Sequence, residues 1–296
     1  MFQKYKYHLL LHFIILLYGF TGILGKLIHQ DFITIVWFRL LFALIGLGLV
    51  LIYLKKSIAV SSAKQLFSLF GIGIVVALHW MTFYKSIQLS TASLGILCLS
   101  TTTLHVSWLE PIIMKRKFSW IEFLLGVFII GGIYFVSNDF NANDYEALAY
   151  GLSSAFFAAF FSTCNGAVVR KIPSTTMTFF EILMSFVFVS FLLLLQGNLT
   201  PKLFHISTSD LLWLLFLGLV CTSFAFLVTI DLIKRLGNFT VSLSINMEPV
   251  YTILLAVFIL HENKKLGSQF YIGSIMIVLV VIANPIIKYY LQKNRR

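Results

Sequence analysis

The chain has 296 residues, of which 59% are hydrophobic and only 11% carry a charge. Because soluble domains are about one quarter charged, this composition excludes a soluble globular protein and predicts one that crosses a membrane many times. A net charge of +11 would favour nucleic acid in a soluble protein, but no basic helix or aromatic-basic stripe accompanies it. We therefore expect no nucleic-acid partner, and we interpret the basic residues as topology signals and contacts with anionic lipid head groups.

Apolar runs divide the chain into ten segments, each of roughly the 20 residues that a helix needs to cross the hydrocarbon core. The predicted spans are 9–28, 33–54, 66–87, 93–114, 119–137, 147–169, 175–195, 211–233, 239–260 and 269–287. The first run could imitate a signal peptide, but it has no clear small-residue cleavage site, so we interpret it as a retained span. The predicted fold is an all-α polytopic membrane protein with ten transmembrane helices.

The Lys and Arg residues gather on one side of these spans. With the N-terminus inside, 16 of the 22 fall in inner segments and four outside, while Lys26 and Arg39 lie within spans. This asymmetry predicts that both termini face the cytoplasm and that the acidic segment 138–146 lies outside. We expect a multi-pass protein of the cell (inner) membrane, surrounded by the lipid bilayer.

The two halves of the chain resemble each other. "ITIVWFRLLFALI" (33–45) aligns with "TTMTFFEILMSFV" (175–187), which places Arg39 opposite Glu181. "FYKSIQLSTASLGILCLSTTT" (83–103) aligns with "TIDLIKRLGNFTVSLSINMEP" (229–249). We predict two repeats, residues 1–140 and 141–296, each of five spans. Because five is odd, the second copy is inverted in the membrane, an arrangement typical of transporters with a midplane substrate site.

Four motifs occur in a recognisable order. They are "YGFTGILGK" (18–26), the Arg of "VWFRLLFA" (36–43), "FYKSIQLSTASLG" (83–95) and "MEPVYTILLAVFILHE" (247–262). With these motifs and their partial repetition, the chain resembles the EamA branch of the drug/metabolite transporter superfamily over residues 9 to 287. The resemblance implies ten helices in two EamA repeats and the movement of small metabolites, often the export of amino acids or drugs.

One departure concerns span four. Many members of the family carry a proline near its middle, matching the one in span nine, but this chain reads "STTTLH" (100–105), with Thr103 opposite Pro249. If a proline-made break shapes the site in the family, this chain must shape it in another way. Threonine hydroxyls can bend a helix mildly by bonding to the carbonyl one turn back.

The strongest candidate site lies in span nine. Glu248 falls near the bilayer centre, Pro249 removes a helix hydrogen bond, and Asn246 adds an amide. The repeat places these residues opposite Thr101, Thr102 and Thr103. We predict a polar pocket for substrate between the two helices. The alternative is that Glu248 is a protonated packing residue.

Further charges lie within or near the predicted spans. Arg39, Lys85 and Lys26 lie toward the outer face, and Glu181, Asp231 and Glu110 lie toward the inner face, so topology does not explain them. We favour Arg39 and Glu181 as substrate-binding residues because they lie deepest. The others have simpler interpretations, since Asp231 can pair with Arg235, Glu110 with nearby bases, and Lys85 can reach the surface.

Three more residues neighbour polar positions, namely His79, Trp80 and Tyr251. We include them as candidate binding residues, although a lone His on an apolar face is more often a packing residue. The three cysteines lie inside apolar runs without a CxxC motif or clustered His, and "HE" (261–262) lacks the second His of a zinc motif. We therefore expect no metal, no cofactor and no catalytic residue.

The resulting hypothesis is a permease for small metabolites that works by alternating access in the direction of export. Mixed charges along the path suit a zwitterion such as an amino acid, and Glu248 could carry a proton for antiport, with facilitated diffusion left open. The alternatives are a membrane-embedded enzyme, for which we find no catalytic set, and a receptor or assembly factor without transport. The partners are a small-molecule substrate and lipid, and a homodimer is left open.

Overall fold

The computed structural model describes residues 2–55, 58–60, 62–137, 140–168, 172–236, 238–245, 247–264 and 266–293. Within these ranges the protein consists of helices joined by turns and short loops. In chain order they are α1 (Phe2–Leu27), α2 (Phe32–Tyr53), α3 (Ala63–Leu89), α4 (Ala92–Leu99), α5 (Thr102–Met114), α6 (Trp120–Val136), α7 (Ala142–Val168), α8 (Ser174–Leu195), η2 (Pro201–Phe204), α9 (Thr208–Leu215), η3 (Phe216–Phe224), α10 (Ala225–Leu236), α11 (Asn238–Ile245), α12 (Glu248–Ile259), η4 (Glu262–Lys264) and α13 (Ser268–Lys293).

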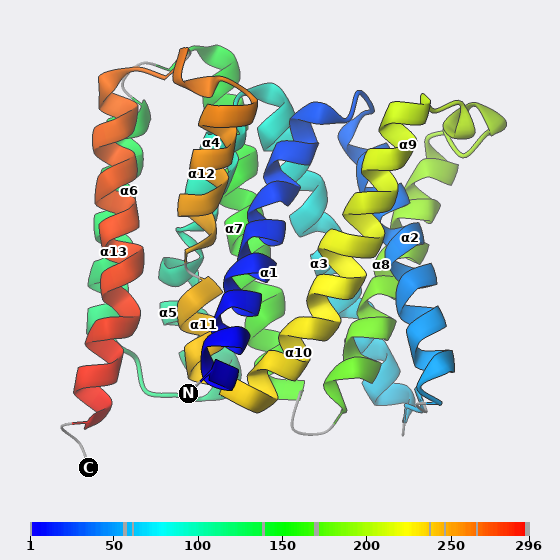
Figure 1. The fold of residues 1–296 in the computed structure, drawn as a ribbon, viewed down its shortest axis with the longest axis horizontal. Helices are drawn as coiled ribbons and strands as arrows, with labels where there is room; N and C mark the ends of the chain where they lie inside the picture. Colours follow the sequence, from blue (N-terminus) through cyan, green and yellow to red (C-terminus); the bar gives the residue numbers. More distant parts are fainter. Residues whose placement is uncertain are drawn as a thin grey trace.

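The helices form one bundle whose long elements run roughly parallel to a common axis. Helix α1 begins and helix α13 ends at the same end of this bundle, which we call the terminal end (Figure 1). The α1–α2 turn, the start of α9 and the α12–α13 connection lie at the other end, which we call the distal end. The expectation that both termini lie on one side therefore agrees with the path of the chain.

Several helices have the length and composition to cross a membrane. Seven candidate spans occur in the described residues: Tyr5–Leu27, Phe32–Tyr53, Ala63–Leu89, Ala92–Met114, Ala142–Val168, Ser174–Leu195 and Thr208–Leu236. Three shorter apolar helices, Trp120–Val136, Glu248–Ile259 and Ser268–Ala283, coincide with the predicted spans five, nine and ten. The all-helical membrane fold is thereby confirmed, while the count of ten crossings stays a prediction.

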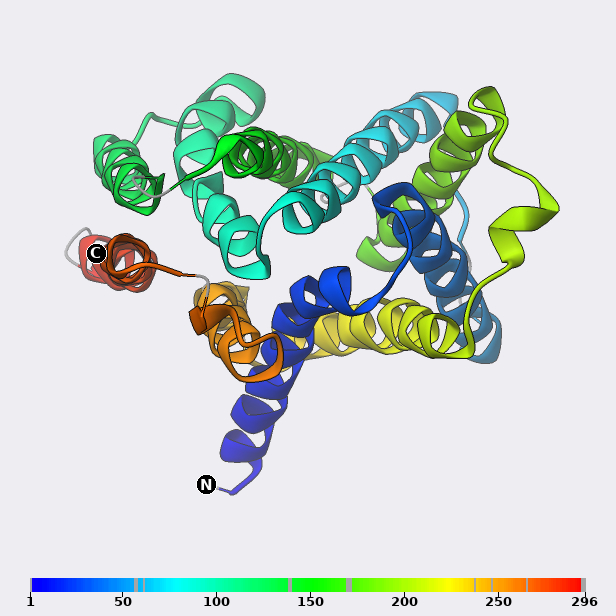
Figure 2. The ribbon, with the colours of Figure 1, turned by 90° about the horizontal axis from the view of Figure 1, so that it is seen from above.

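The packing of the two halves is reciprocal. Helix α3 of the first half packs against α7 and α8, and η3 with α10 of the second half packs against α1 and α2. In the same way α5 packs on α7, and α12 packs on α1. Helices α6 and α13 pair with each other at one edge of the bundle (Figure 2). The contacts thus relate the halves as the aligned repeats predict.

Two glycines lie at an equivalent pair of these reciprocal crossings. A Cβ on Gly73 of α3 would meet Met184 Cβ at 2.7 Å and the Glu181 carbonyl at 2.9 Å. A Cβ on Gly218 of η3 would meet Phe42 Cβ at 2.5 Å and the Arg39 carbonyl at 3.0 Å. Since the alignment pairs Arg39 with Glu181, both crossings lie beside the same repeat position, and only glycine lets the backbones approach this closely.

The glycines of "YGFTGILGK" let α1 lie close to its neighbours. Gly19 and Gly22 face Thr252 of α12, where a Cβ would lie 3.0 and 3.1 Å from its side chain. Gly25 faces Tyr84 of α3 at 2.9 Å. The motif therefore explains how α1 packs between the two halves, a small-residue contact of the kind that joins membrane helices.

Two of the predicted spans are interrupted at equivalent positions. Span four is divided at Ser100 and Thr101 into α4 and α5, and span nine is divided between Ile245 and Glu248 into α11 and α12. At the first break Thr101 N–H bonds to the Cys98 carbonyl at 3.0 Å, and its hydroxyl donates to the same carbonyl at 2.7 Å. Span four is thus divided into two helices without a proline at the break.

A third irregularity lies in the segment Thr208–Leu236, where η3 is a nine-residue π-helix. Its wide turns are bridged by hydroxyls, since Thr222 Oγ1 donates to the Leu217 carbonyl at 2.8 Å and Ser223 Oγ to the Gly218 carbonyl at 3.1 Å. Ser223 also donates to the Ala43 carbonyl of α2 at 2.9 Å. π-Helical turns occur frequently at functional sites, and this one lies beside Arg39.

Candidate functional site

A buried arginine lies at the centre of the polar contacts between the halves. Arg39 of α2 is only 7% exposed, and its guanidinium carbon lies 3.9 Å from the centroid of the Trp80 ring. Arg39 Nε donates to Thr222 Oγ1 at 3.1 Å, and one Nη donates to the Tyr84 hydroxyl at 3.2 Å. These four residues, from α2, α3 and η3, form what we call the Arg39 cluster.

The Arg39 cluster contains no negative charge. No carboxylate of the described residues lies within ion-pair distance of Arg39, whose two hydrogen bonds are to neutral hydroxyls. A guanidinium has five N–H donors, and these two hydrogen bonds use two of them, so three N–H groups are available for a ligand. A buried cation held by an aromatic face and two hydroxyls is well suited to a carboxylate or phosphate ligand.

Glu248 supplies the opposite charge nearby. It is the first residue of α12, is half-buried, and forms no ion pair with Arg39. Thr252 Oγ1 donates to the Glu248 carbonyl at 3.0 Å and to the Gly19 carbonyl of α1 at 3.2 Å. Two residues along α1, the Thr21 carbonyl accepts a hydrogen bond of 3.5 Å from Tyr84, the residue that holds Arg39. The two predicted charges Arg39 and Glu248 thus belong to one region of the bundle.

The candidate residues at the two helix breaks differ in burial and in hydrogen bonding. Pro249 is buried in the first turn of α12, where a missing N–H removes no helix bond, so the expectation that it removes one was wrong. Thr101 is fully buried, Thr102 Oγ1 donates to the Ala155 carbonyl of α7 at 3.4 Å, and Thr103 is half-buried. Asn246 lies outside the described residues.

Glu181 lies apart from the Arg39 cluster. It is 7% exposed on α8, and its Oε2 accepts a hydrogen bond from Asn165 Nδ2 of α7 at 3.3 Å. Within the described part of the chain, Glu181 Oε1 and Asn165 Oδ1 have no hydrogen-bond partner. Because each unpartnered buried polar atom costs about 1–3 kcal/mol, this pair requires an explanation beyond packing.

His79 and Tyr251 make contacts between helices. His79 Nδ1 is 2.8 Å from Ser154 Oγ and 3.0 Å from the Ser154 carbonyl, which joins α3 to α7. Tyr251 OH is 3.0 Å from Nδ1 of His12 on α1. Neither residue forms a hydrogen bond with Arg39, so neither belongs to the Arg39 cluster. Their role in substrate binding stays a prediction.

Two other carboxylates pair with bases as their simpler interpretations predict, while the predicted reach of Lys85 to the surface stays a prediction. Arg235 Nε lies 2.6 Å from Asp231 Oδ2, which confirms the predicted helix ion pair, and Arg116 lies 3.1 Å from Glu110. The ammonium of Lys85 lies 5.3 Å from the centroid of the Phe32 ring. These charges are accounted for without a substrate.

Carboxylates join the elements at the distal end. Glu262 accepts hydrogen bonds from the Ala92 and Ser93 backbone N–H groups at 2.8 and 3.1 Å, and it thereby caps the start of α4. Asp210 of α9 accepts hydrogen bonds from His29 N–H at 3.0 Å and Gln30 Nε2 at 3.2 Å in the α1–α2 turn. Both carboxylates are almost fully buried, so the distal end is closed by specific polar contacts.

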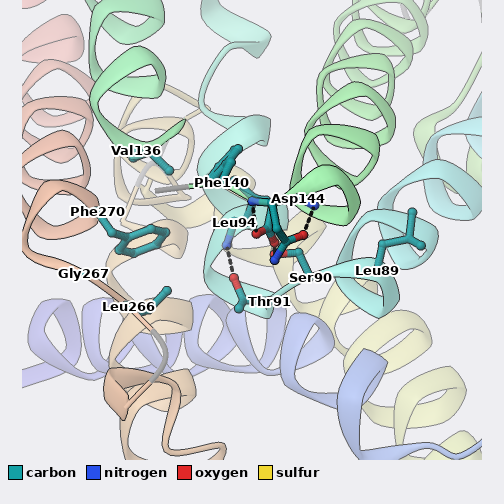
Figure 3. A pocket seen from close by; sticks show the side chains of 11 residues that line it. Leu89, Ser90, Thr91, Leu94, Val136, Phe140, Asp144, Leu266, Gly267 and Phe270 are labelled. Atoms are coloured by element: carbon teal, nitrogen blue, oxygen red, sulfur yellow. Dashed lines mark hydrogen bonds between the residues drawn. The ribbon is translucent and has the colours of Figure 1, made fainter. Parts of the chain in front are cut away.

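A pocket of about 260 Å³ also lies at this end, between the start of α4, the α6–α7 connection and the start of α13 (Figure 3). Phe140 and Phe270 form part of its apolar wall, and Asp144 accepts a hydrogen bond from the Ser90 hydroxyl at its polar side. None of its lining residues belongs to the Arg39 cluster. We therefore base the functional site on the buried charges and not on this pocket.

Several members of the site were not singled out from the sequence. Tyr84 lies one helical turn after Trp80, a spacing that could have placed both rings on the face of Arg39. Asn165 is an amide in an apolar run, which is a usable signal. Tyr18 begins the motif "YGFTGILGK", although no role in binding was predicted for it from the sequence. Thr222 had no distinguishing signal.

Comparisons with known proteins agree with this architecture. A family model described as the EamA-like transporter family matches residues 6–138 and 146–284, which together make up most of the chain. A solved chain described as "Crystal structure of protein" is 14% identical, with a TM-score of 0.66, and the match covers 95% of this chain and 97% of that one. This likeness supports the fold. No curated protein matches the sequence.

Proposed function

Because the chain belongs to the EamA-like transporter family, we propose that it carries a small zwitterionic metabolite, such as an amino acid, across the cell membrane by alternating access. Membership of a transporter family of the drug/metabolite type supports transport over enzymatic activity. The substrate, the direction and the coupling are our proposals. We propose export, with both termini in the cytoplasm.

The observation that carries this proposal is the separation of Arg39 from Glu248. Both lie against the same stretch of α1, Arg39 through Tyr84 and Glu248 through Thr252, yet no ion pair among the described residues joins them. A zwitterion bound between them would place its carboxylate on the three remaining Arg39 donors and its ammonium on Glu248. Such a ligand satisfies both charges at once, whereas a simple anion or cation leaves one unpaired.

The aromatic rings support the positioning of Arg39. Trp80 covers one face of the guanidinium, and Tyr84 holds one edge by a hydrogen bond. Since the rotamer of Arg39 is fixed before substrate arrives, little side-chain entropy is lost on binding. Lysine at this position would keep the charge but lose the planar fork.

The interrupted helices support alternating access. We propose ten transmembrane helices in two inverted repeats of five, with the breaks α4/α5 and α11/α12 at the midplane. Transporters with inverted repeats bind substrate beside such discontinuous helices. The two halves make equivalent contacts, in which α3 packs on α7 and α8, and η3 with α10 packs on α1 and α2. Because the contacts are equivalent, each half could adopt the conformation of the other when the site changes the side that it faces.

Proton coupling is the second part of the proposal. Glu248 forms no ion pair with a Lys, Arg or His of the described residues, so no neighbouring cation holds it permanently charged. A proton that binds Glu248 when substrate leaves would keep the charge of the site balanced. Facilitated diffusion remains the alternative, and it requires no proton on Glu248.

Flux measurements in proteoliposomes test the proposal. The panel should hold neutral amino acids, the matching amines without a carboxylate, and the matching carboxylic acids without an amine. We expect transport of at least one zwitterion and weaker transport of its two truncated analogues. Absence of flux for the whole panel, with correctly folded protein, would favour the receptor or assembly-factor interpretation.

A further inference from the structure

The pair formed by Glu181 and Asn165 occupies a second buried polar position, separate from the Arg39 cluster. One hydrogen bond of 3.3 Å joins the side chains, and Glu181 Oε1 and Asn165 Oδ1 are left without partners. No Lys or Arg of the described residues forms an ion pair with Glu181. A carboxylate buried to this extent in a membrane helix defaults to a functional interpretation.

Both unsatisfied atoms are hydrogen-bond acceptors. A carboxylate oxygen and an amide oxygen accept hydrogen bonds or coordinate cations, and neither can donate. A ligand that satisfies them must therefore carry N–H or O–H donors or a positive charge. With one carboxylate and one neutral amide, the pair can balance a single positive charge, so a monovalent cation fits better than a divalent one.

The backbone holds Glu181 in place. Ser185 Oγ donates to the Gly73 carbonyl at 2.7 Å and to the Glu181 carbonyl at 2.7 Å, which fastens α8 to α3 at the glycine crossing. A Cβ on Gly73 would lie 2.9 Å from that same Glu181 carbonyl. The carboxylate thus projects from a rigid contact toward α7, and its cost of burial cannot be relieved by a shift of the helix.

The repeat relates this position to that of Arg39. Arg39 lies seven residues after the start of α2 at the distal end, and Glu181 lies seven residues after the start of α8 at the terminal end. At 1.5 Å per residue, each charge lies about 10 Å in from its own end of the bundle. The two positions are equivalent in the repeats but opposite in charge, so their ligands should also be opposite in charge.

We propose that Glu181 and Asn165 form a second site that binds a monovalent cation, on the terminal side of the Arg39 cluster. The cation is either an alkali ion that couples transport or the ammonium group of the substrate on its way through the protein. Both have the chemistry that the two acceptor oxygens recognise. This inference rests on the proposed transport function, but it concerns a different site.

The thermal unfolding of the purified protein tests the site directly. The unfolding midpoint should be titrated with NaCl, methylammonium chloride and choline chloride at constant ionic strength. We expect a saturable rise with Na⁺ or with methylammonium and none with choline, which is too large for the pair. A rise with Na⁺ identifies the alkali ion, and a rise with methylammonium alone identifies the substrate ammonium.

Variants on both sides of the pair make the result specific. Glu181→Gln should abolish the saturable rise, Asn165→Leu should increase the half-saturating concentration about tenfold, and Asn165→Asp, which adds a charge, should lower it. Glu146→Gln removes an exposed carboxylate and serves as the matched control. The three variants are expected to change cation affinity in different ways. If one of them fails to fold, the other two still test the site.

Arg39→Gln separates this inference from the proposed function. It should lose transport yet keep the cation-dependent rise in midpoint. Equal midpoints in all three salts for the wild-type protein would overturn the site and leave Glu181 as a protonated packing residue. A rise that persists unchanged in Glu181→Gln would overturn it as well, because the cation would then bind elsewhere.

Discussion

Glu262 accepts a 2.6 Å hydrogen bond from the hydroxyl of Ser93, which joins the segment after α12 in the second half to the first turn of α4 in the first half. With the two backbone N–H groups of Ala92 and Ser93, this carboxylate caps a helix of the other repeat. The distal end of the bundle is therefore closed by a contact that must open if substrate is to pass there.

Glu262→Gln is the first prediction. The amide keeps an acceptor oxygen but loses the charge at the helix N-terminus, so we expect the free energy of unfolding to fall by about 1–2 kcal/mol. Thermal unfolding in detergent measures the effect. Ser93→Ala, which removes only the hydroxyl bond, should have a smaller effect, and an equal loss in both variants would contradict the role of the charge.

The second prediction concerns the guanidinium of Arg39. Arg39→Gln should reduce substrate transport about 10- to 100-fold, since hydrogen bonds to a charged group contribute about 1.5–3 kcal/mol. Arg39→Lys should recover only part of this loss, because a single ammonium cannot form two parallel bonds to a carboxylate. Flux in proteoliposomes, normalised to the amount of inserted protein, gives the comparison. If flux and protein level fall together, the role of Arg39 is structural.

The third prediction separates proton coupling from binding at Glu248. Glu248→Gln preserves the shape of the side chain but cannot gain or lose a proton. We expect a folded protein that still exchanges substrate for substrate but no longer responds to a pH gradient. Vesicle flux with and without that gradient, with Glu146→Gln as control, measures this. A pH response equal to that of the wild type would remove Glu248 from the coupling step.

The fourth prediction fixes the orientation in the membrane. Asn141 is exposed in the α6–α7 connection at the distal end, whereas the native Cys98 and Cys221 are buried. In a background without the three native cysteines, Asn141→Cys should react with a membrane-impermeant thiol reagent in intact cells. Reaction only after the cells are opened would place the termini outside and reverse the direction of our proposal.

The sequence was sufficient for the all-helical membrane fold and for the presence of two EamA repeats. Arg39 and Glu181, paired from two short matches, lie beside equivalent glycine crossings in the structure. A membrane helix is predicted from one continuous apolar run, and a repeat is predicted from the similarity of two stretches of sequence. Neither prediction needs knowledge of how distant helices pack.

The features that the sequence did not predict depend on contacts between distant residues. The stacking of Arg39 on Trp80, the cap on α4 from Glu262, and the pairing of Glu181 with Asn165 each bring together different helices. The break at Thr101 uses a residue that is tolerated inside a helix, so its effect depends on the surrounding packing. Such contacts have no periodic pattern in a single sequence.

The π-helical segment Phe216–Phe224 has a consequence for how this chain could change in evolution. Each residue of an α-helix accounts for about 100° of rotation. The wider turns of a π-helix rotate less per residue, so the same residues wound as an ordinary α-helix would turn all of α10 relative to α9. Thr229 would rotate away from Tyr18, and Arg235 would lose its 2.8 Å bond to Tyr7. The π winding of this segment therefore sets the phase of every later contact on the helix, and substitutions that convert it to ordinary turns should be tolerated less well than changes in the loops.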